Sequence, residues 1–552
     1  MIDVVSTSYR EWHEFDGVTV CGFAFDGETL LSEQSLCTHF ADVETLSGFA
    51  DALDALDGFF AVALEGEDGL FLGVDHVRSI PLLYAPEAGL AGDDAAGIRK
   101  RLGDPPNDPL AESELLAGGT VLDNRTLVSD LFTVRPGEAV ELRDGEAETE
   151  RYVEYCPTGG TGVGDREARE RLHEALDTAF DRFVDFVGDR QVALSLSGGT
   201  DSRLLATELA RRDCDVLAYS FGRPDCADVT VAAEIAAALD IPWTFVEYTM
   251  EGWREWYCSP EREAFVAATT TDDSIPNYGL MPALAHLREV GLLDDDAVCT
   301  TGQTVVGMSE NVPDQLTVPE PTGAALVDAI LDYWARWQWD DPAFDRAVRE
   351  RIAESVSAEV TSLESGFSQF ERWKLADRHV KYFLAEARQY EFHGLSSWDA
   401  LWDSELVAAW EATSFSDRRG KQLYTAVADE RFTDVAGVSP AAAAGTVAGT
   451  AAPSLAGRAF DGVAETLADS PIAPLIAPVY WWLQRRRSTY GDHPLAWYGM
   501  IPPDLFARLY SGREDVHALQ TLDAVGRASF LDGTVTDPPE DGVLSLPYDG
   551  RE

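Results

Sequence analysis

The sequence predicts an α/β protein of more than one domain, and three observations support this prediction. The chain has 552 residues, more than one ordinary domain holds, and 45% of them are hydrophobic, which is enough for packed cores. Short runs rich in Val, Phe and Leu follow one another up to about residue 155, separated by Gly, Asp and Glu. From residue 165 onward, strands alternate with amphipathic helices, which is typical of a parallel sheet with right-handed crossovers.

The first region, residues 1–158, is expected to be rich in strands. Three of its apolar runs, at 18–25, 58–66 and 69–76, are bounded by turn residues, as strands are. The glycine-rich stretch 159–165 that follows predicts a flexible joint and a domain boundary.

The second region, residues 165–435, is expected to form a doubly wound parallel sheet. Apolar residues between 172 and 187 recur every three or four positions, so they predict one face of a helix. Next come a buried strand ending near residue 197, a helix over 201–212, a strand at 217–222, a helix over 228–239 and a strand around 243–248. Residues 324–435 are expected to be mostly helical.

The last region, residues 436–552, is predicted to contain a mobile loop and a helical extension. Residues 438–456 are low in complexity, and a Trp-rich helical stretch follows to about residue 530, with a frayed tail. Arg485–Arg487 is the one basic run in the chain. We interpret it as a helix end against acidic neighbours, with an anion or membrane-surface contact as the alternative.

The charge of the chain describes its environment more than its function. Asp plus Glu number 97 against 42 Lys plus Arg, which gives a net charge of −55 and a pI near 4.3. Such a surface repels nucleic acid and anionic lipid. Only four of the basic residues are lysines. Acidic, lysine-poor surfaces resemble those of proteins from a salt-rich cytoplasm. There the high ionic strength screens the repulsion between the acidic side chains.

Cysteine usage and hydropathy indicate a soluble cytoplasmic protein without a structural metal. The seven cysteines are scattered and form no CxxC pair, so neither a zinc site nor a disulfide framework is predicted. The N-terminus lacks the basic start and apolar core of a signal peptide, and no run approaches the ~18 apolar residues of a membrane span.

The chemistry is predicted to lie in a loop between an apolar strand and a helix. Two glycines let the backbone turn tightly, so that successive N–H groups and the positive end of the helix face one anion. Asp201 is placed to hold Mg²⁺ against bound phosphates. The loop is not a Walker sequence, because no GxxxxGK[ST] pattern occurs. The predicted nucleotide-binding residues are Leu196, Ser197, Gly198, Gly199, Thr200, Asp201 and Ser202.

This SGGTDS loop resembles the pyrophosphate loop of the ATP pyrophosphatases, within the asparagine synthase family. Phe221 falls where that family's second strand meets the adenine, and Thr301 and Gly302 where its second loop approaches the nucleotide. Residues 388–403 and 420–424 resemble later family segments, so the resemblance covers 165 to about 435. It implies an adenine nucleotide α-hydrolase-like domain that uses ATP and Mg²⁺ to convert a carboxylate, such as aspartate, to an acyl adenylate for attack by ammonia or an amine.

Residues 1–158 resemble the family's glutaminase domain, which implies an Ntn-hydrolase-like α/β/β/α sandwich. In that family an N-terminal cysteine attacks glutamine, with its own amine as the base. Here Ile2 follows Met1, and Cys21 is internal, so we interpret Cys21 as a buried structural residue. The domain is therefore predicted to lack glutaminase activity.

Two departures from the family affect the second domain. Its second loop is usually acidic, whereas here no acid occurs between Gly302 and Glu310. The late loop that usually carries a charge-neutralising lysine contains none, which leaves Lys421 and Arg431 as candidates. Lys374 and Lys381, seven apart, are interpreted as a solvated pair on one helix face.

Two hypotheses follow from these features. The first is an ATP-dependent, AMP- and pyrophosphate-forming amide ligase, with Asp201 and Lys421 as catalytic residues and Asp201 as the metal ligand. The second is a non-catalytic ATP-binding homologue that serves a partner enzyme. The intact loop favours the first, and the altered second loop favours the second. The sequence leaves open the acceptor carboxylate, the amine and whether the chain forms a homodimer.

Overall fold

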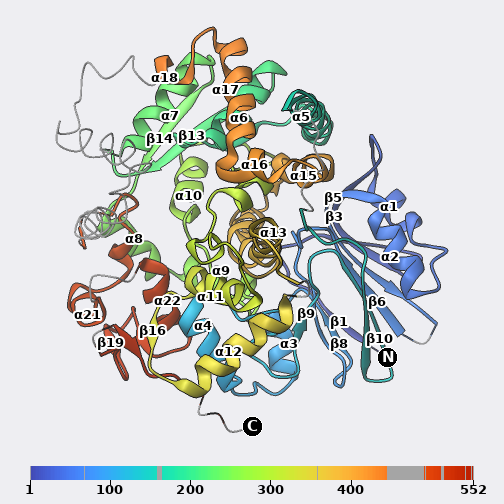
Figure 1. The fold of residues 1–552 in the computed structure, drawn as a ribbon, viewed down its shortest axis with the longest axis vertical. Coiled ribbons are helices and arrows are strands. Elements are labelled where there is room, and N and C mark those ends of the chain that lie inside the picture. Colours follow the sequence, from blue (N-terminus) through green and yellow to red (C-terminus); the bar gives the residue numbers. More distant parts are fainter. Residues whose placement is uncertain are drawn as a thin grey trace.

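The computed structural model shows two layered α/β units joined by a large helical region (Figure 1). Among the residues described, no helix is long and apolar enough to cross a membrane. Residues 159–164 of the predicted joint 159–165, most of the predicted loop 438–456 and the run Arg485–Arg487 lie outside the described residues. The structure describes residues 2–67, 69–157, 165–224, 226–356, 359–443, 490–491, 493–510, 515–540, 542–548 and 550.

The N-terminal unit contains two sheets. The larger has the order β11-β10-β6-β5-β3-β2, its neighbours are antiparallel, and β4 pairs with β3. The smaller has the order β1-β8-β7-β9. The strands are β1 (Asp3–Val5), β2 (Trp12–Phe15), β3 (Val18–Asp26), β4 (Thr29–Leu30), β5 (Leu56–Glu65), β6 (Gly69–Val74), β7 (Leu83–Ala85), β8 (Leu90–Gly92), β9 (Phe132–Thr133), β10 (Glu138–Arg143) and β11 (Glu146–Arg151).

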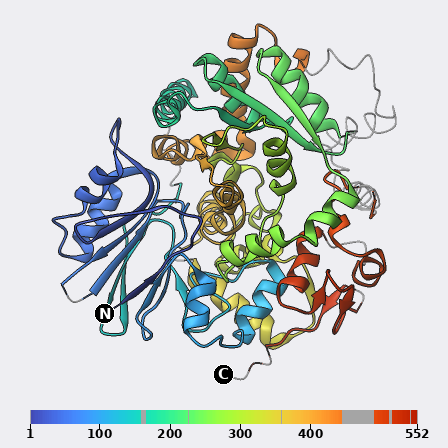
Figure 2. The same ribbon diagram turned by 180° about the vertical axis from the view of Figure 1, so that it is seen from behind.

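Side-chain alternation stacks these sheets into four layers of helix, sheet, sheet and helix. Phe60 and Val62 of β5 pack with the core under α1 (Glu33–His39) and α2 (Leu46–Asp54), whereas Ala61 between them faces the core shared with the second sheet. Leu83 of β7 packs on the far side with α3 (Ala95–Arg101). Figures 1 and 2 show α1 and α2 on the outer face of the larger sheet.

The second unit contains a parallel sheet of order β14-β13-β12-β15-β17, which confirms the predicted parallel α/β pattern. Leu194 of β12 packs with the helices of one face and Ala193 with those of the other, so both faces are covered. The strands are β12 (Val192–Ser195), β13 (Val216–Gly222), β14 (Trp243–Glu247), β15 (Val298–Thr300) and β17 (Ser396–Ser397); α5 (Asp165–Val187), α6 (Thr200–Arg211) and α7 (Ala227–Ala238) cover one face, and α8 (Met250–Tyr257) and α10 (Met281–Glu289) the other.

The described residues of 324–435 are largely helical, as predicted, and the C-terminal helices pack on the second unit. The predicted frayed tail is wrong for residues 542–548, because β20 pairs with β16 and Leu544 is buried. The remaining helices are α4 (Pro109–Gly118), α9 (Pro260–Thr269), η1 (Val305–Ser309), η2 (Asp314–Leu316), α11 (Gly323–Trp334), α12 (Pro342–Ser355), α13 (Leu363–Trp373), η3 (Lys374–Phe383, a π-helix), η4 (Leu384–Glu386), α14 (Ala387–Phe392), η5 (Ala400–Trp402), α15 (Ser404–Glu411), α16 (Phe415–Arg418), η6 (Arg419–Lys421), α17 (Gln422–Ala436), α18 (Pro440–Ala443), η7 (Trp497–Met500), α21 (Pro503–Leu509) and α22 (Val516–Ala524); the short strands are β16 (Gln338–Trp339), β18 (Ala528–Ser529), β19 (Thr534–Val535) and β20 (Val543–Leu544).

Buried ion pairs cross the boundary between the two units. Arg182 of α5 lies 2.6 Å from Asp57, near the start of β5, and 2.9 Å from Asp403. Arg78 lies 2.9 Å from Asp273. Removing one partner of such a pair leaves an uncompensated buried charge, so these pairs disfavour any other arrangement of the units.

Candidate functional site

The predicted loop lies at the carboxyl edge of the parallel sheet, where the strand order reverses. β12 is central, and the strand that follows it in the chain, β13, lies on one side while β15 lies on the other. Ligands of open α/β sheets bind in the crevice at such a switch point. The loops after β12 and β15 meet there closely: a Cβ added to Gly302 would lie 3.0 Å from Ser202 N and 3.4 Å from Asp201 Cβ. The close approach of the two loops therefore favours a glycine at residue 302.

The first loop is stabilised by hydrogen bonds of its own serine hydroxyl groups. Ser202 Oγ accepts from Ser197 N at 3.1 Å and lies 3.0 Å from Ser197 Oγ. Gly199 N donates to Ser197 Oγ at 3.2 Å. At its start the loop is anchored to the sheet, because Leu196 N donates to Tyr219 O at 2.8 Å. The Ser202 hydroxyl thus shapes the loop, and the exposed Ser197 stands at its surface.

The start of α6 presents backbone donors at this edge. Gly199 is the N-cap and provides no side-chain capping hydrogen bond, and Thr200 and Asp201 form the first helical positions. The first N–H groups of a helix have no partner within the helix, and their dipole favours a negative charge. This geometry fits a phosphate group. Gly198 packs against α7, where an added Cβ would lie 3.1 Å from Val231 Cβ.

Lys421 meets this loop from a segment more than 200 residues later in the chain. Its Nζ lies 3.0 Å from Asp201 Oδ2, and the two side chains are 14% and 23% exposed. Lys421 has φ +59°, next to Gly420 with φ +65°. A non-glycine residue in the left-handed region costs roughly 1–2 kcal/mol, and such strain clusters at functional sites. The structure therefore brings the two predicted catalytic residues together.

The second loop is held by carboxylates from distant elements. Thr301 donates to Asp399 Oδ1 through its backbone N at 2.8 Å and through Oγ1 at 3.0 Å. Gln303 Nε2 donates to Glu386 Oε2 at 3.3 Å. Burial raises the pKa of Asp399 to about 7, and burial together with the charge of Asp399 raises the pKa of Glu386 to about 7. Glu386 is nevertheless partly accessible.

Glu386 and Asp399 are the site residues that sequence reasoning missed. The usual acids of the second loop are absent here, and these two carboxyl groups approach the same loop from η4 and from the end of β17. Asp399 falls inside the segment 388–403 that resembles the family, so that stretch offered a signal for it. Glu386 lies two residues before the segment.

The interpretation of Lys374 and Lys381 as a solvated pair is wrong. Lys374 is 5% and Lys381 2% exposed. Lys374 Nζ donates to Gly307 O at 2.9 Å, on the far side of the second loop, whereas Lys381 Nζ donates to Val121 O at 2.6 Å. The two lysines belong to a π-helix, whose i→i+5 bonding widens the turn, so residues seven apart no longer share a face. Burial lowers the pKa of Lys374 to about 8.

Arg431 does not lie at the first loop. Its Nη1 is 2.9 Å from Glu208 and 2.9 Å from Asp177. Glu208 follows the start of α6 by eight residues, or about 12 Å at 1.5 Å per residue. Of the two candidates for the missing lysine, Lys421 is therefore the one that the fold brings to the loop.

Phe221 lies near the end of β13, at the same carboxyl edge. Its half-buried ring stacks on Tyr248, with centroids 5.1 Å apart and planes at 27°. One side of the ring is thus already covered, and Gly222 beside it has φ +129° and faces Pro494 O. These contacts hold Phe221 at the end of the strand.

Cys21 of the N-terminal unit is a poor nucleophile. The residue is 5% exposed, and burial raises the pKa of its thiol to about 12. It lines a cavity of about 520 Å³ between the two units, together with Arg10, which pairs with Glu391 at 2.8 Å. Ile2 immediately precedes β1 and packs partly buried on the core between the sheets.

The residues at the first loop fit a magnesium-bound nucleotide. Mg²⁺ in phosphate sites is usually bound by one or two carboxylates, with phosphate oxygens and water as its other ligands. Asp201 provides one carboxylate beside the donors of α6. Among the described residues no group of three or more His, Cys, Asp or Glu could hold a metal ion without such help.

Comparison with known proteins yields only distant similarity. No protein-family description matches the sequence, and no curated protein does. A structure of the allosteric regulatory enzyme of purine biosynthesis matches 55% of this chain at 12% identity and a TM-score of 0.17. Glutamine phosphoribosylpyrophosphate amidotransferase from B. subtilis, complexed with ADP and GMP, matches 53% at 11% identity and a TM-score of 0.16. The chain spans 57% and 64% of the length of these two structures.

Proposed function

We propose that this protein is an ATP-dependent amide ligase that forms AMP and pyrophosphate. The observation that supports this proposal most directly is the meeting of three elements at the switch point of the parallel sheet. They are the uncapped start of α6, the ion pair of Asp201 with Lys421, and the recessed carboxyl group of Glu386 behind the second loop.

In this proposal the first loop holds the phosphates of ATP. Backbone N–H groups at the start of α6 bind the β- and γ-phosphates, and Asp201 holds Mg²⁺ with them. Mg²⁺, when bound, neutralises phosphate charge. Lys421 exchanges its contact with Asp201 for the leaving pyrophosphate, whose charge grows as the α–β bond breaks.

The reaction then has two balanced steps. A carboxylate oxygen of the substrate attacks the α-phosphorus, the bond to the β-phosphate oxygen breaks, and pyrophosphate leaves with that electron pair. Ammonia or an amine next attacks the carbonyl carbon, and AMP leaves. Glu386, with a pKa of about 7, accepts the proton that the attacking nitrogen loses.

A pyrophosphate-release assay with the purified chain in molar KCl tests this proposal. A panel of amino acids and other carboxylates is supplied with ATP, Mg²⁺ and ammonium, and AMP is quantified in parallel. Equal amounts of AMP and pyrophosphate, dependent on one carboxylate, are the expected result. Release of ADP and phosphate would contradict an adenylate.

A non-catalytic ATP-binding role is the second candidate, because the second loop carries no acid between Gly302 and Glu310. It predicts calorimetric binding of Mg·ATP without AMP formation for any carboxylate. In this proposal glutamine is not the nitrogen source, since Cys21 of the N-terminal unit is buried. Glutamate release from glutamine above background would contradict this point.

A further inference from the structure

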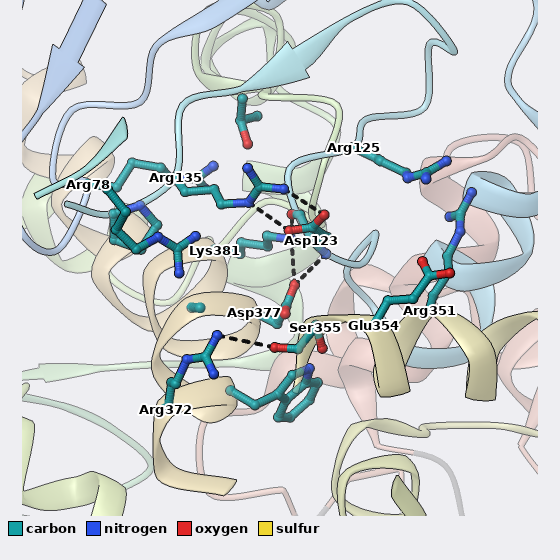
Figure 3. Close-up of a pocket in the computed structure, with 15 residues that line it drawn as sticks. Arg78, Asp123, Arg125, Arg135, Arg351, Glu354, Ser355, Arg372, Asp377 and Lys381 are labelled. Atoms are coloured by element: carbon teal, nitrogen blue, oxygen red, sulfur yellow. Dashed lines mark hydrogen bonds and ion pairs between the residues drawn. The ribbon is translucent and has the colours of Figure 1, made fainter. Parts of the chain in front are cut away.

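A second polar cavity lies between the N-terminal unit and the helical region, and its lining is strongly basic (Figure 3). Its volume is about 210 Å³. One wall comes from the segment 123–136 and Arg78, and the other from α12, α13 and the π-helix η3. The first loop and Lys421 are not part of this lining.

Basic side chains outnumber acidic ones in the lining of this cavity, whereas acidic residues outnumber basic ones in the chain as a whole. Three acidic side chains line the cavity, Asp123, Glu354 and Asp377, against seven basic ones. The net charge of the protein is −55, and only 42 of its residues are Lys or Arg. The seven basic residues are Arg78, Arg125, Arg135, Arg151, Arg351, Arg372 and Lys381. Four carboxylates outside the lining, Asp273, Glu114, Glu138 and Glu154, pair with five of these cations.

Two of these arginines have donors that the protein does not use. Arg78 is 2% exposed and donates from Nη2 to Asp273 at 2.9 Å, but its buried Nε has no hydrogen-bond partner among the described residues. Buried donors without a partner are rare, and an unseen ligand is one of their standard explanations. The Arg125 side chain is exposed and makes no hydrogen bond or ion pair within the described part of the chain.

The other cations are held in place around the cavity. Arg135 donates to Asp123 at 2.7 Å, and Arg351 donates to the buried Glu114 at 2.7 Å. Lys381 lies 2.9 Å from Asp377. Figure 3 shows Arg78, Arg135 and Lys381 on one side of the space and Arg125 and Arg351 on the other. A guanidinium group uses several donors, so one carboxylate contact fixes its plane and leaves others for a ligand.

We propose that this cavity binds a small multivalent oxyanion that carries phosphate or carboxylate groups. Six of the seven cations are arginines, whose planar forks match the paired oxygens of these groups. The volume is below the roughly 300–1,000 Å³ of sites for drug-sized ligands, which favours a compact anion over a nucleotide. The inference does not depend on the reaction proposed for the first loop.

Isothermal titration calorimetry on the full chain, at one fixed KCl concentration, tests this proposal. Pyrophosphate, orthophosphate and citrate are titrated separately, so the arms distinguish phosphate from carboxylate ligands. We expect saturable binding of at least one of them, weakened about tenfold by Arg125→Gln and more by Arg125→Glu. Arg166→Gln is the matched control, because that side chain is 91% exposed and lies outside the cavity. Its affinity should equal that of the wild type.

Pyrophosphate also has a proposed place at the first loop, so Lys421→Ala is titrated alongside. Binding that survives Lys421→Ala and falls with Arg125→Gln supports the cavity. Binding that follows the opposite pattern, or that Arg125→Gln and Arg166→Gln weaken equally, overturns the proposal. So does the absence of saturable heat for all three anions.

Discussion

The two loops that meet at the carboxyl edge of the parallel sheet, after β12 and after β15, are held in place by different interactions. The first, from Leu196 to Gly199, is held by hydrogen bonds of Ser197 and Ser202, and it leaves the first backbone donors of α6 without a side-chain cap. The second, from Thr301 to Gly307, is tied by side chains from other elements, with Asp399 and Glu386 on one side and Lys374 on the other.

This difference separates two chemical tasks. Open N–H groups and a helix dipole suit the first loop to hold an anion without further help. The second loop instead gathers carboxyl groups whose pKa burial raises to about 7, where a proton can be gained or lost near neutral pH. A loop without acids between Gly302 and Glu310 therefore still has acidic groups beside it.

Glu386→Gln should have the largest effect, because it removes the proposed proton acceptor behind the second loop. We expect turnover to fall by about 10³-fold, within the range for a general base. The acceptor must be ionised, so wild-type turnover should rise with pH through about 7, and the variant should lose that rise. Steady-state AMP formation between pH 6 and 8.5 measures both effects.

Glu310→Gln is the matched control, since Glu310 directly follows η1 and is exposed. Its pH profile should match that of the wild type. A Glu386→Gln enzyme that keeps the rise through pH 7 would assign the proton transfer to another group and remove the contrast between the loops.

Lys421→Ala tests the first loop and should lower turnover by about 10²-fold, the scale of one lost transition-state donor. ATP affinity should change by less than about threefold, because the contact strengthens only as charge develops on pyrophosphate. Lys421→Gly separates the side chain from the backbone, since glycine tolerates the φ of +59° at this position. It should be as slow as the alanine variant but no less stable. Wild-type turnover in either variant would refute the role.

Asp201→Ala should affect binding more than chemistry. The part of ATP affinity that depends on Mg²⁺ should fall about 10- to 100-fold, from the loss of one charged contact of about 1.5–3 kcal/mol. Affinity for ATP without Mg²⁺ should not fall, since removing Asp201 frees Lys421, 3.0 Å away, to meet the phosphates. Calorimetry with Mg²⁺ and with EDTA measures both, and Asp213→Asn, at an exposed aspartate, is the control. An unchanged dependence on Mg²⁺ would contradict the metal assignment.

The difference between the two loops also explains why the sequence predicted the residues of the first loop but not the carboxyl groups beside the second. The first loop was predictable because its ligand groups are consecutive and its strand and helix have clear periodicities. The acids of the second loop come from positions 83 and 98 residues away, which no local pattern records. Asp399 follows β17, which pairs with β15, and Glu386 ends η4. The burial of Lys374 was hidden for another reason. An α-helical spacing places it beside Lys381, but the chain winds as a π-helix there and separates the two.

Asp399→Asn should have the smallest effect on turnover, because the amide oxygen of asparagine can still accept from the Thr301 N and Oγ1. We expect turnover at pH 8 to stay within about threefold of the wild type. The effect should instead appear in stability. Burial raises the pKa of Asp399 from 3.8 to about 7 in the folded protein. The contribution of this group to the free energy of unfolding is therefore complete below about pH 4 and is lost as the pH rises toward 7. Asparagine does not titrate, so its contribution does not change with pH.

The stability of the Asp399→Asn variant relative to the wild type should therefore increase as the pH rises. Between pH 5.5 and 8 the difference in unfolding free energy should grow by about 2 kcal/mol, from roughly 1.4 kcal/mol for each pH unit up to the folded pKa. Measurement should not go much lower, because the protein has a pI near 4.3. The charge of Asp399 also raises the pKa of Glu386, so the rise of turnover in the variant should move to lower pH. A stability difference independent of pH would mean that Asp399 is ionised throughout and that the second loop holds an ordinary carboxylate.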